Sequence, residues 1–154
     1  MTGQQKHKHS PPLLTKESIH SAKEGCRFCS SAVQDSVVAK YKTAMAIQDR
    51  NPVTRGHLLI LPERHVVDYF LLTSKEKQNI DALLAICRLN IMSEDPTVSG
   101  FNVGVNCGES AGQTIFHCHV HLIPRRDGDT PSPRGGVRGV IPGKRDYPVS
   151  GQNM

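Results

Sequence analysis

The chain reads HCHVHLI from residue 117 to residue 123, with a histidine at every second position of an apolar run. Side chains of a β-strand alternate between its two faces. A strand over 115–123 therefore sets His117, His119 and His121 on one face and turns the residues between them into the core. At a rise of ~3.3 Å per residue, neighbouring imidazoles lie roughly 6 to 7 Å apart. We interpret these three histidines as parts of one functional site and not as three unrelated surface residues.

Two kinds of chemistry fit three histidines on one strand face. The His-x-His spacing suits a catalytic metal, with the imidazoles as zinc ligands. Alternatively, one imidazole is a nucleophile, and its neighbours bind and protonate a phosphate group. Residue types and spacing leave both hypotheses open.

The segment in front of this strand, residues 108–114, reads GESAGQT. Small residues allow a ligand to approach the backbone closely, and successive N–H groups can then bind an anion. A plain β-turn would use the same residues. Beside the row of histidines, the segment predicts an anion-binding loop that faces a nucleophile.

The other segments predict an α+β fold. Strands are predicted at 37–41, 43–47, 57–61, 101–105 and 115–123. A capping-box pattern at Thr73 and Glu76, followed by apolar residues at helical spacing, predicts one main helix that Asp95 and Pro96 end. Because short turns join most of the strands, we expect a mainly antiparallel sheet of about five strands, covered by that helix.

The chain of 154 residues is long enough for one domain with a substantial core. Aromatic residues make up only 5% of it and Trp is absent, so the core must consist mainly of aliphatic side chains. No apolar run has the ~18 to 20 residues of a membrane span, and the polar N-terminus lacks the apolar stretch of a secretion signal. We predict a cytoplasmic protein with a mobile N-terminal arm (1–24), one domain (25–126) and an irregular basic C-terminal tail (127–154).

The net charge of +5 lies at the two ends of the chain. Residues 1–24 carry four Lys and two Glu, and residues 125–154 carry six Lys or Arg and three Asp, whereas the region between them is neutral. A nucleic-acid-binding fold usually has its basic patch on structured elements, so we predict no long nucleic acid partner and leave small anionic ligands open. Four arginines near the C-terminus either are solvated or contact a polyphosphate group: Arg125, Arg126, Arg134 and Arg138.

These features together resemble the histidine-triad (HIT) family of nucleotide hydrolases and transferases. AGQT at 111–114, followed by HxHxHLIPR at 117–125, resembles the triad motif of the family. DRxPxxxGH at 49–57, with PxxH at 62–65, is similar to its nucleoside-binding strand pair. The resemblance implies a HIT-like fold over about two-thirds of the chain, and PRGGVRGVIP at 133–142 is similar to the tail of a group of bacterial members.

The resemblance implies a role for each matching residue. His119 would be the nucleophile that forms a nucleotidyl-histidine intermediate, and an imidazole with a pKa of about 6.5 is largely unprotonated at neutral pH. His121 would contact the phosphate and the leaving group, and His117 completes the catalytic triad. The implied substrate contacts are Asp49 on the ribose hydroxyls, Asn106, Gln113 and Thr114 on phosphoryl oxygens, and His57 behind the histidine cluster.

Cys26 and Cys29 form a C-x-x-C pair. Without a secretion signal, this spacing indicates a metal or redox site and not a disulfide framework. Some HIT members carry zinc on two cysteines and two histidines, and the matching positions here are Cys26, Cys29, His65 and His117. The resemblance thus implies a structural zinc that fixes the strand of His119 without contacting the substrate. Buried or redox-active thiols are the alternative.

The implied activity is cleavage of the α-phosphate bond in a nucleoside 5′-phosphate derivative, with the P–O bond of a diadenosine polyphosphate favoured. Asn106 and Asp49 match the phosphoramidase-like branch of the family, so cleavage of the P–N bond of an adenosine phosphoramidate is the alternative. Two hypotheses come from other classes, a zinc-dependent hydrolase with the three histidines as ligands and a non-catalytic nucleotide-binding protein. The family also implies a homodimer. The sequence leaves the base preference and the physiological substrate open.

Overall fold

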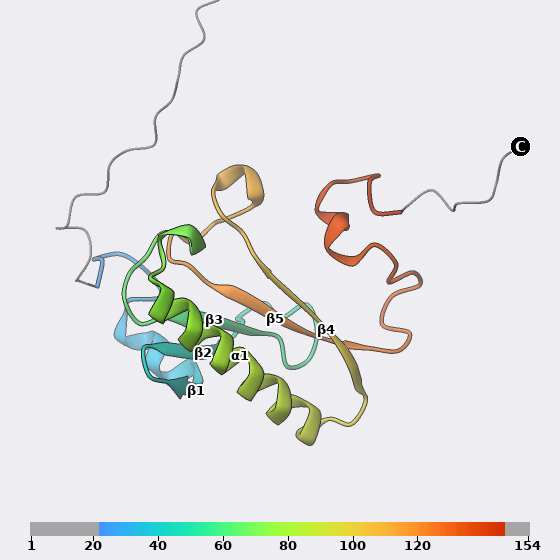
Figure 1. Ribbon diagram of the computed structural model, residues 1–154, viewed down its shortest axis with the longest axis horizontal. Coiled ribbons are helices and arrows are strands. Elements are labelled where there is room, and N and C mark those ends of the chain that lie inside the picture. Colours follow the sequence, from blue (N-terminus) through green and yellow to red (C-terminus); the bar gives the residue numbers. More distant parts are fainter. Residues whose placement is uncertain (1–21, 147–154) are drawn as a thin grey trace, which may run out of the picture.

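One five-stranded sheet forms the centre of the computed structural model, which describes residues 22–146 (Figure 1). The strands are β1 (Val37–Tyr41), β2 (Ala44–Gln48), β3 (Leu58–Pro62), β4 (Val98–Val105) and β5 (Val120–Arg126). Their order is β1-β2-β3-β5-β4, and every neighbouring pair is antiparallel. The predicted α+β, mainly antiparallel architecture is therefore confirmed. The predicted arm at 1–24 lies almost wholly outside the described residues.

Within the described residues, a single α-helix, α1 (Ser74–Glu94), crosses one face of the sheet (Figure 1). Its predicted capping box is formed, since Thr73 Oγ1 accepts the N–H of Glu76 and the Glu76 carboxylate accepts the N–H of Thr73. The helix ends before Asp95, as predicted. Residues 22–146 also contain four short 3-10 helices: η2 (Ser31–Ser36), η3 (Tyr69–Leu71), η4 (Glu109–Ala111) and η5 (Gly136–Val140).

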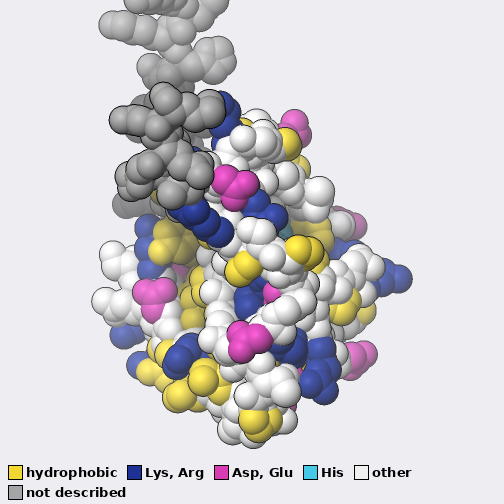
Figure 2. Space-filling view, turned by 90° about the vertical axis from the view of Figure 1, so that its right-hand side faces the viewer, with side chains coloured by type: hydrophobic (Ala, Val, Ile, Leu, Met, Phe, Trp, Pro, Cys, Tyr) yellow, Lys and Arg dark blue, Asp and Glu magenta, His cyan; other side chains and the backbone are white. Residues whose placement is uncertain are grey.

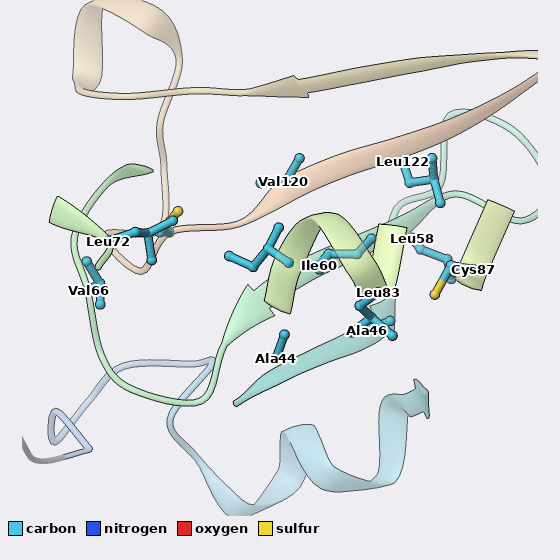
Figure 3. Close-up of a cluster of buried hydrophobic side chains, with 12 residues drawn as sticks. Ala44, Ala46, Leu58, Ile60, Val66, Leu72, Leu83, Cys87, Val120 and Leu122 are labelled. Atoms are coloured by element: carbon cyan, nitrogen blue, oxygen red, sulfur yellow. The ribbon is translucent and has the colours of Figure 1, made fainter. Parts of the chain in front are cut away.

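The hydrophobic core occupies both faces of the sheet. On one face, Ile80, Leu83 and Cys87 of α1 pack against the strands (Figure 3). Their strand partners are Ala44, Ala46, Leu58, Ile60, Val120 and Leu122. On the other face, Phe28 and Val33 cover a second cluster, made by Met45, Ile47, Leu59 and Leu61. The sequence predicted only the helix as a cover, but β2 and β3 are buried on both faces and need a second one.

The N-terminal end of the histidine strand differs from the prediction. β5 begins at Val120 and not at residue 115, because its pairing with β3 goes no further than Ile60 opposite Val120. Pro62 has no N–H with which to continue the ladder. The N–H of Cys118 bonds instead to the carbonyl of Val66, at 2.6 Å. His117 and His119 therefore precede the strand.

The C-terminal end of β5 was also predicted wrongly. Pro124 does not end the strand, which continues to Arg126. Pro124 pairs with Phe101 of β4, whereas the pairing of β3 with β5 reaches only Leu122, so this proline needs no N–H on that side. Strand β4 correspondingly begins at Val98, three residues before the predicted start.

Residues 127–146 contain turns and the helix η5, which lies beside β4. Figure 2 shows the face that carries this segment, and there Lys and Arg side chains lie among acidic and hydrophobic ones. The end of the predicted tail, after residue 146, lies outside the described residues. From residue 22 to residue 146, no helix has the length and apolar character to cross a membrane.

The Glu76 carboxylate joins α1 to the segment after β3. It accepts hydrogen bonds from Arg64 at 2.6 and 2.7 Å, and from Thr73. Burial by itself would raise the pKa of Glu76, but the bonds from Arg64 and Thr73 hold this pKa below its usual value. The ionised carboxylate therefore stabilises the folded state at neutral pH. That contribution is lost as the pH falls below about 4.3, the ordinary pKa of Glu, toward the lower folded-state pKa.

We expect Glu76→Gln to lower the free energy of unfolding by about 2 kcal/mol at pH 7, because hydrogen bonds to a charged group are lost. At pH 3 the difference from the wild type should shrink, since the wild-type carboxylate is then largely protonated in the unfolded state. Urea denaturation at both pH values measures it. Glu63→Gln is the matched control, because Glu63 makes an exposed ion pair with Lys40 at 3.6 Å and should change little. An equal loss in both variants would contradict the role of Glu76.

Candidate active site

A cleft of about 930 Å³ opens along the end of β2 and the start of β5. Five of the residues singled out in the sequence line it: Asp49, Asn106, Thr114, His119 and His121. The structure thus brings together the turn after β2, the loop after β4 and the histidine segment. His57, Gln113 and His117 do not line the cleft but are buried behind its wall.

His119 is largely buried and lines this cleft. Its Nδ1 lies 2.7 Å from the carbonyl oxygen of His117. A carbonyl oxygen only accepts, so Nδ1 carries the proton and a neutral His119 has its lone pair on Nε2. Phe28 packs edge-on against the ring, with 5.2 Å between the centroids. The geometry thus holds the imidazole in the tautomer that a nucleophile needs.

His57 fixes the tautomer of His121. The backbone N–H of Val53 donates to His57 Nδ1 at 3.3 Å, so a neutral His57 carries its proton on Nε2. That nitrogen lies 3.0 Å from His121 Nδ1, to which it donates. His121 therefore has its own proton on Nε2. His121 can therefore donate a hydrogen bond from Nε2, and His119 can accept one at its own Nε2. The centroids of the two rings are 5.2 Å apart.

Burial keeps these imidazoles neutral. It lowers the pKa of His121 to about 4, aided by His119 and His57, and it lowers the pKa of His117 to about 4. It also lowers the pKa of His57, although the nearby Asp49 acts in the opposite direction. At neutral pH these three rings are therefore uncharged, as the tautomers above require.

Asp49 stands in the turn after β2, on the cleft wall. Its Oδ1 accepts the backbone N–H of Asn51 at 2.8 Å, which is the local bond that favours Asp at a turn. The other oxygen, Oδ2, lies 3.6 Å from His57 Nδ1. A carboxylate fixed in this way can accept hydrogen bonds from a pair of neighbouring hydroxyls.

The loop 106–114 differs from the predicted row of free N–H groups. The N–H groups of Ala111 and Gln113 bond to the carbonyl of Gly108, and that of Gly112 bonds to Glu109. Gly108 and Gly112 both have φ of +86°, a conformation that favours glycine. The backbone of the loop therefore serves its own fold, and the side chains of Asn106 and Thr114 are the parts that line the cleft.

Gln113 supports this loop from inside. Its Oε1 accepts the N–H of Gly108 at 2.8 Å, and its Nε2 donates to the carbonyls of Val67 and Ile115. The side chain is only 4% exposed. With its amide used in this way, Gln113 is not placed to hold phosphoryl oxygens, in contrast to the expectation from the sequence.

The four predicted ligands lie close together and could hold a metal ion: Cys26, Cys29, His65 and His117. The sulfur-to-nitrogen distances are 3.3 Å from Cys29 to His65, 3.5 Å from Cys29 to His117 and 3.7 Å from Cys26 to His117, each measured to Nδ1. Tetrahedral zinc, with Zn–S of about 2.3 Å and Zn–N of about 2.0 to 2.1 Å, separates such atoms by about 3.6 Å. The three sulfur-to-nitrogen distances therefore fit the ligands of one tetrahedrally coordinated ion.

The tautomer of His117 fits the same ion. Its Nε2 donates to the carbonyl of Pro62 at 2.9 Å, which leaves the lone pair of Nδ1 directed to the cysteines. His65 Nε2 is buried and has no partner among the described residues, so only its Nδ1 is engaged. The donor set of two thiols and two imidazoles can hold a metal ion without any group from the cleft.

The three histidines of the motif do not converge on one metal position. Of the possible ligand groups among residues 22–146, one contains His117 and another contains His121, and neither contains His119. The second group joins His121 to Asp49 and His57, whose ring nitrogens are occupied by the hydrogen bonds described above.

The arginines near the C-terminal end of β5 lie outside the cleft lining. Arg125 binds Asp129 and Asn102, and Arg126 binds Asp95 and Thr54. These contacts anchor the turn after β5 and the loop before β3. Contact of these two side chains with a polyphosphate, one of the two sequence hypotheses, is therefore not supported.

Sequence reasoning missed the apolar wall of the cleft. Phe28, Val33, Ile47 and Leu59 line it. The signal available was Phe28, the aromatic residue between the two cysteines of the C-x-x-C pair. The backbone N–H of Val53, which orients His57, could not be predicted from the sequence, because every residue except proline has a backbone N–H.

A family model described as "HIT domain" matches residues 30–128. The chain is similar to the protein named "Protein hit" of Bacillus subtilis, with 36% identity over 111 residues that cover 70% of this chain and 74% of that protein. It is also similar to an "AP-4-A phosphorylase" of Mycobacterium tuberculosis, with 36% identity over 94 residues. That match covers 60% of this chain but only 48% of the relative.

Among solved structures, the chain resembles a crystal structure described as a Zn-bound histidine triad family protein from Mycobacterium smegmatis. The TM-score is 0.63 at 30% sequence identity, and the match covers 70% of this chain and 80% of that one. The family match includes all five strands and the histidine segment.

Proposed function

Since the chain belongs to the HIT domain family, we propose that it is a nucleotide hydrolase that cleaves the α-phosphate bond of a nucleoside 5′-phosphate derivative. The favoured bond is the P–O bond of a diadenosine polyphosphate. One observation carries the proposal: the bond from His119 Nδ1 to a backbone carbonyl leaves Nε2 free to act as the nucleophile in a residue that lines the cleft.

In the first step, the lone pair of His119 Nε2 forms a bond to the α-phosphorus. The bond from phosphorus to the leaving oxygen breaks, and its electron pair departs with that oxygen. The Nε2–H of His121 donates a hydrogen bond to the developing charge and keeps its proton. In the second step, the oxygen of water bonds to the phosphorus, the P–N bond breaks and its electron pair returns to Nε2. One proton of the water stays on the monophosphate, and the other is released to solvent.

The protonation states of His119 and His121 support cleavage of a P–O bond. A polyphosphate leaves as a stable anion and needs only hydrogen bonds and positive charge. An amine leaving group needs a proton, and a neutral His121 between His57 and the cleft is a poor source of one. Cleavage of a P–N bond stays the alternative, because Asn106 lines the cleft and matches the phosphoramidase-like pattern.

The other parts of the cleft suit an adenylate. The apolar wall of Phe28, Val33 and Ile47 would cover the base, and Asp49 would accept hydrogen bonds from the ribose hydroxyls. Thr114 and Asn106 would hold phosphoryl oxygens beside His119. The relative named AP-4-A phosphorylase favours the same substrate class.

Zinc is the metal we propose for the Cys26, Cys29, His65 and His117 cluster. The tetrahedral spacing, the tautomer of His117 and the relative described as Zn-bound support it. A zinc ion there would supply structural cross-linking. It would fix the backbone at His117, whose carbonyl orients His119, and the chemistry would remain with the histidines.

A cytoplasmic homodimer belongs to the same proposal. α1 exposes Ile86, Leu89 and Met92, and β4, an edge strand of the described sheet, exposes Val103. A second copy of the chain would cover these apolar side chains.

The test compares two adenylates with different leaving groups, diadenosine tetraphosphate and adenosine 5′-phosphoramidate. We expect AMP from both, faster from the tetraphosphate, with ATP as its second product. If phosphate takes the place of water in the second step, addition of inorganic phosphate should yield ADP as the product in place of AMP. Faster release from the phosphoramidate would favour the P–N alternative. No release from either, with the nucleotide still bound, would favour a non-catalytic binding protein.

A further inference from the structure

A second, smaller cavity of about 320 Å³ adjoins the cleft. Three residues line both hollows: Arg27, Thr114 and Ile115. Thr114 stands beside the histidine segment, so the boundary between the two lies at the position proposed for the α-phosphate. A substrate whose nucleoside lies against the apolar wall of the cleft would extend across this boundary into the smaller cavity.

The second cavity carries two cationic side chains, Lys23 and Arg27, and one acidic one, Glu24. Within residues 22–146, no hydrogen bond or ion pair engages the guanidinium of Arg27 or the ammonium of Lys23. This balance of charge favours an anion, whereas Asp49, which suits hydroxyl groups, lines the larger cleft and not the smaller cavity.

The backbone around Arg27 is fixed. The N–H of Cys29 bonds to the carbonyl of Cys26 at 3.1 Å, and Ser30 Oγ donates to the carbonyl of Arg27 at 2.8 Å. Arg27 thus rises from a tight turn between two proposed metal ligands. Because these bonds already order the backbone, binding of a phosphate would order only the side chain of Arg27, whose planar guanidinium can bind two oxygens at once.

We infer that Arg27, assisted by Lys23, forms the subsite for the anionic leaving group, the phosphate chain beyond the α-phosphate. This inference rests on the proposed hydrolase function and names the part of the site that would select polyphosphates. Arg125 and Arg126 cannot serve in its place, because both are bound to acidic side chains outside the cleft.

The subsite predicts a loss that depends on the leaving group. Arg27→Ala should lower kcat/KM for diadenosine tetraphosphate by about 10- to 100-fold, mainly through KM, because a charge-assisted contact to the bound substrate is lost. The value for adenosine 5′-phosphoramidate, whose leaving group carries no phosphate, should change by less than about threefold. Arg27→Lys should recover part of the loss, and Lys75→Ala, which removes an exposed cation of α1, is the matched control.

A binding measurement separates the subsite from the chemistry. Titration calorimetry with AMP and with the α,β-methylene analogue of ATP gives the ratio of two affinities, and Arg27→Ala should lower affinity for the analogue alone. Zinc content and Tm check that the turn still folds, and Lys23→Ala repeats the test outside it. An unchanged ratio in both alanine variants overturns the subsite. If the wild type hydrolyses neither substrate but the ratio still falls, the hydrolase proposal fails and the anion subsite stands.

Discussion

Replacing His119 by alanine is expected to lower AMP release from diadenosine tetraphosphate by at least about 10⁴-fold. His119 Nε2 would form the P–N bond that replaces the P–O bond, and neither of the neighbouring histidines can act as the nucleophile instead. His121 has a proton on its cleft nitrogen, and His117 has both ring nitrogens directed away, one to Pro62 and one to the cysteines. The measurement is AMP formation per active site under single-turnover conditions.

The covalent intermediate provides a second readout. Wild-type protein mixed with substrate labelled in the α-phosphate and quenched with alkali should retain label, because phosphorus bound to a histidine nitrogen is stable there. His119→Ala should retain no label, whereas His121→Ala should still become labelled, but more slowly than the wild type. Tm must be compared too, since His119 packs against Phe28. An alanine variant that still turns over at a few per cent of the wild-type rate would refute the nucleophilic role.

Removal of zinc is expected to give the largest loss of stability. A ligand that binds only the folded state adds about 4 kcal/mol when its free concentration is 1,000-fold above Kd. For a chain of this length, each kcal/mol corresponds to about 2 to 4 °C, so a strong chelator should lower Tm by roughly 10 °C. Thermal unfolding with and without chelator, combined with elemental analysis for one zinc per chain, measures it.

Cysteine variants show where the zinc acts. Cys29→Ser should lose the metal and show the lower Tm. Cys107→Ser removes a thiol outside the cluster, so this variant should keep the metal and the wild-type Tm. Loss of activity should follow loss of the fold around His117. If chelation instead abolishes activity while Tm is unchanged, the metal takes part in the chemistry, and the hypothesis of a zinc-dependent hydrolase gains.

Several parts of the fold followed from local patterns. The capping box at Thr73 and Glu76 is a contact between residues three apart, so it was readable directly and is confirmed. The end of β5 was not readable, because it depends on which partner strand stops first: Pro124 lies inside the strand only since β4 pairs with it from one side. Segment 26–36 was not recognised as the cover of the second sheet face, because its contacts with β2 and β3 are non-local.

The sequence by itself determined the chemical groups of this protein: the row of alternating histidines, the cysteine pair and the helix with its cap. Spacing along a chain fixes which residue types can share a face, and for His117, His119 and His121 that was enough to predict a site. Only the tertiary structure decided which nitrogen of each ring is free, because the deciding partners are backbone groups of Val53, Pro62 and His117 itself. It also turned Gln113 inward and put Arg27 where two cavities meet, since both depend on segments distant in the chain.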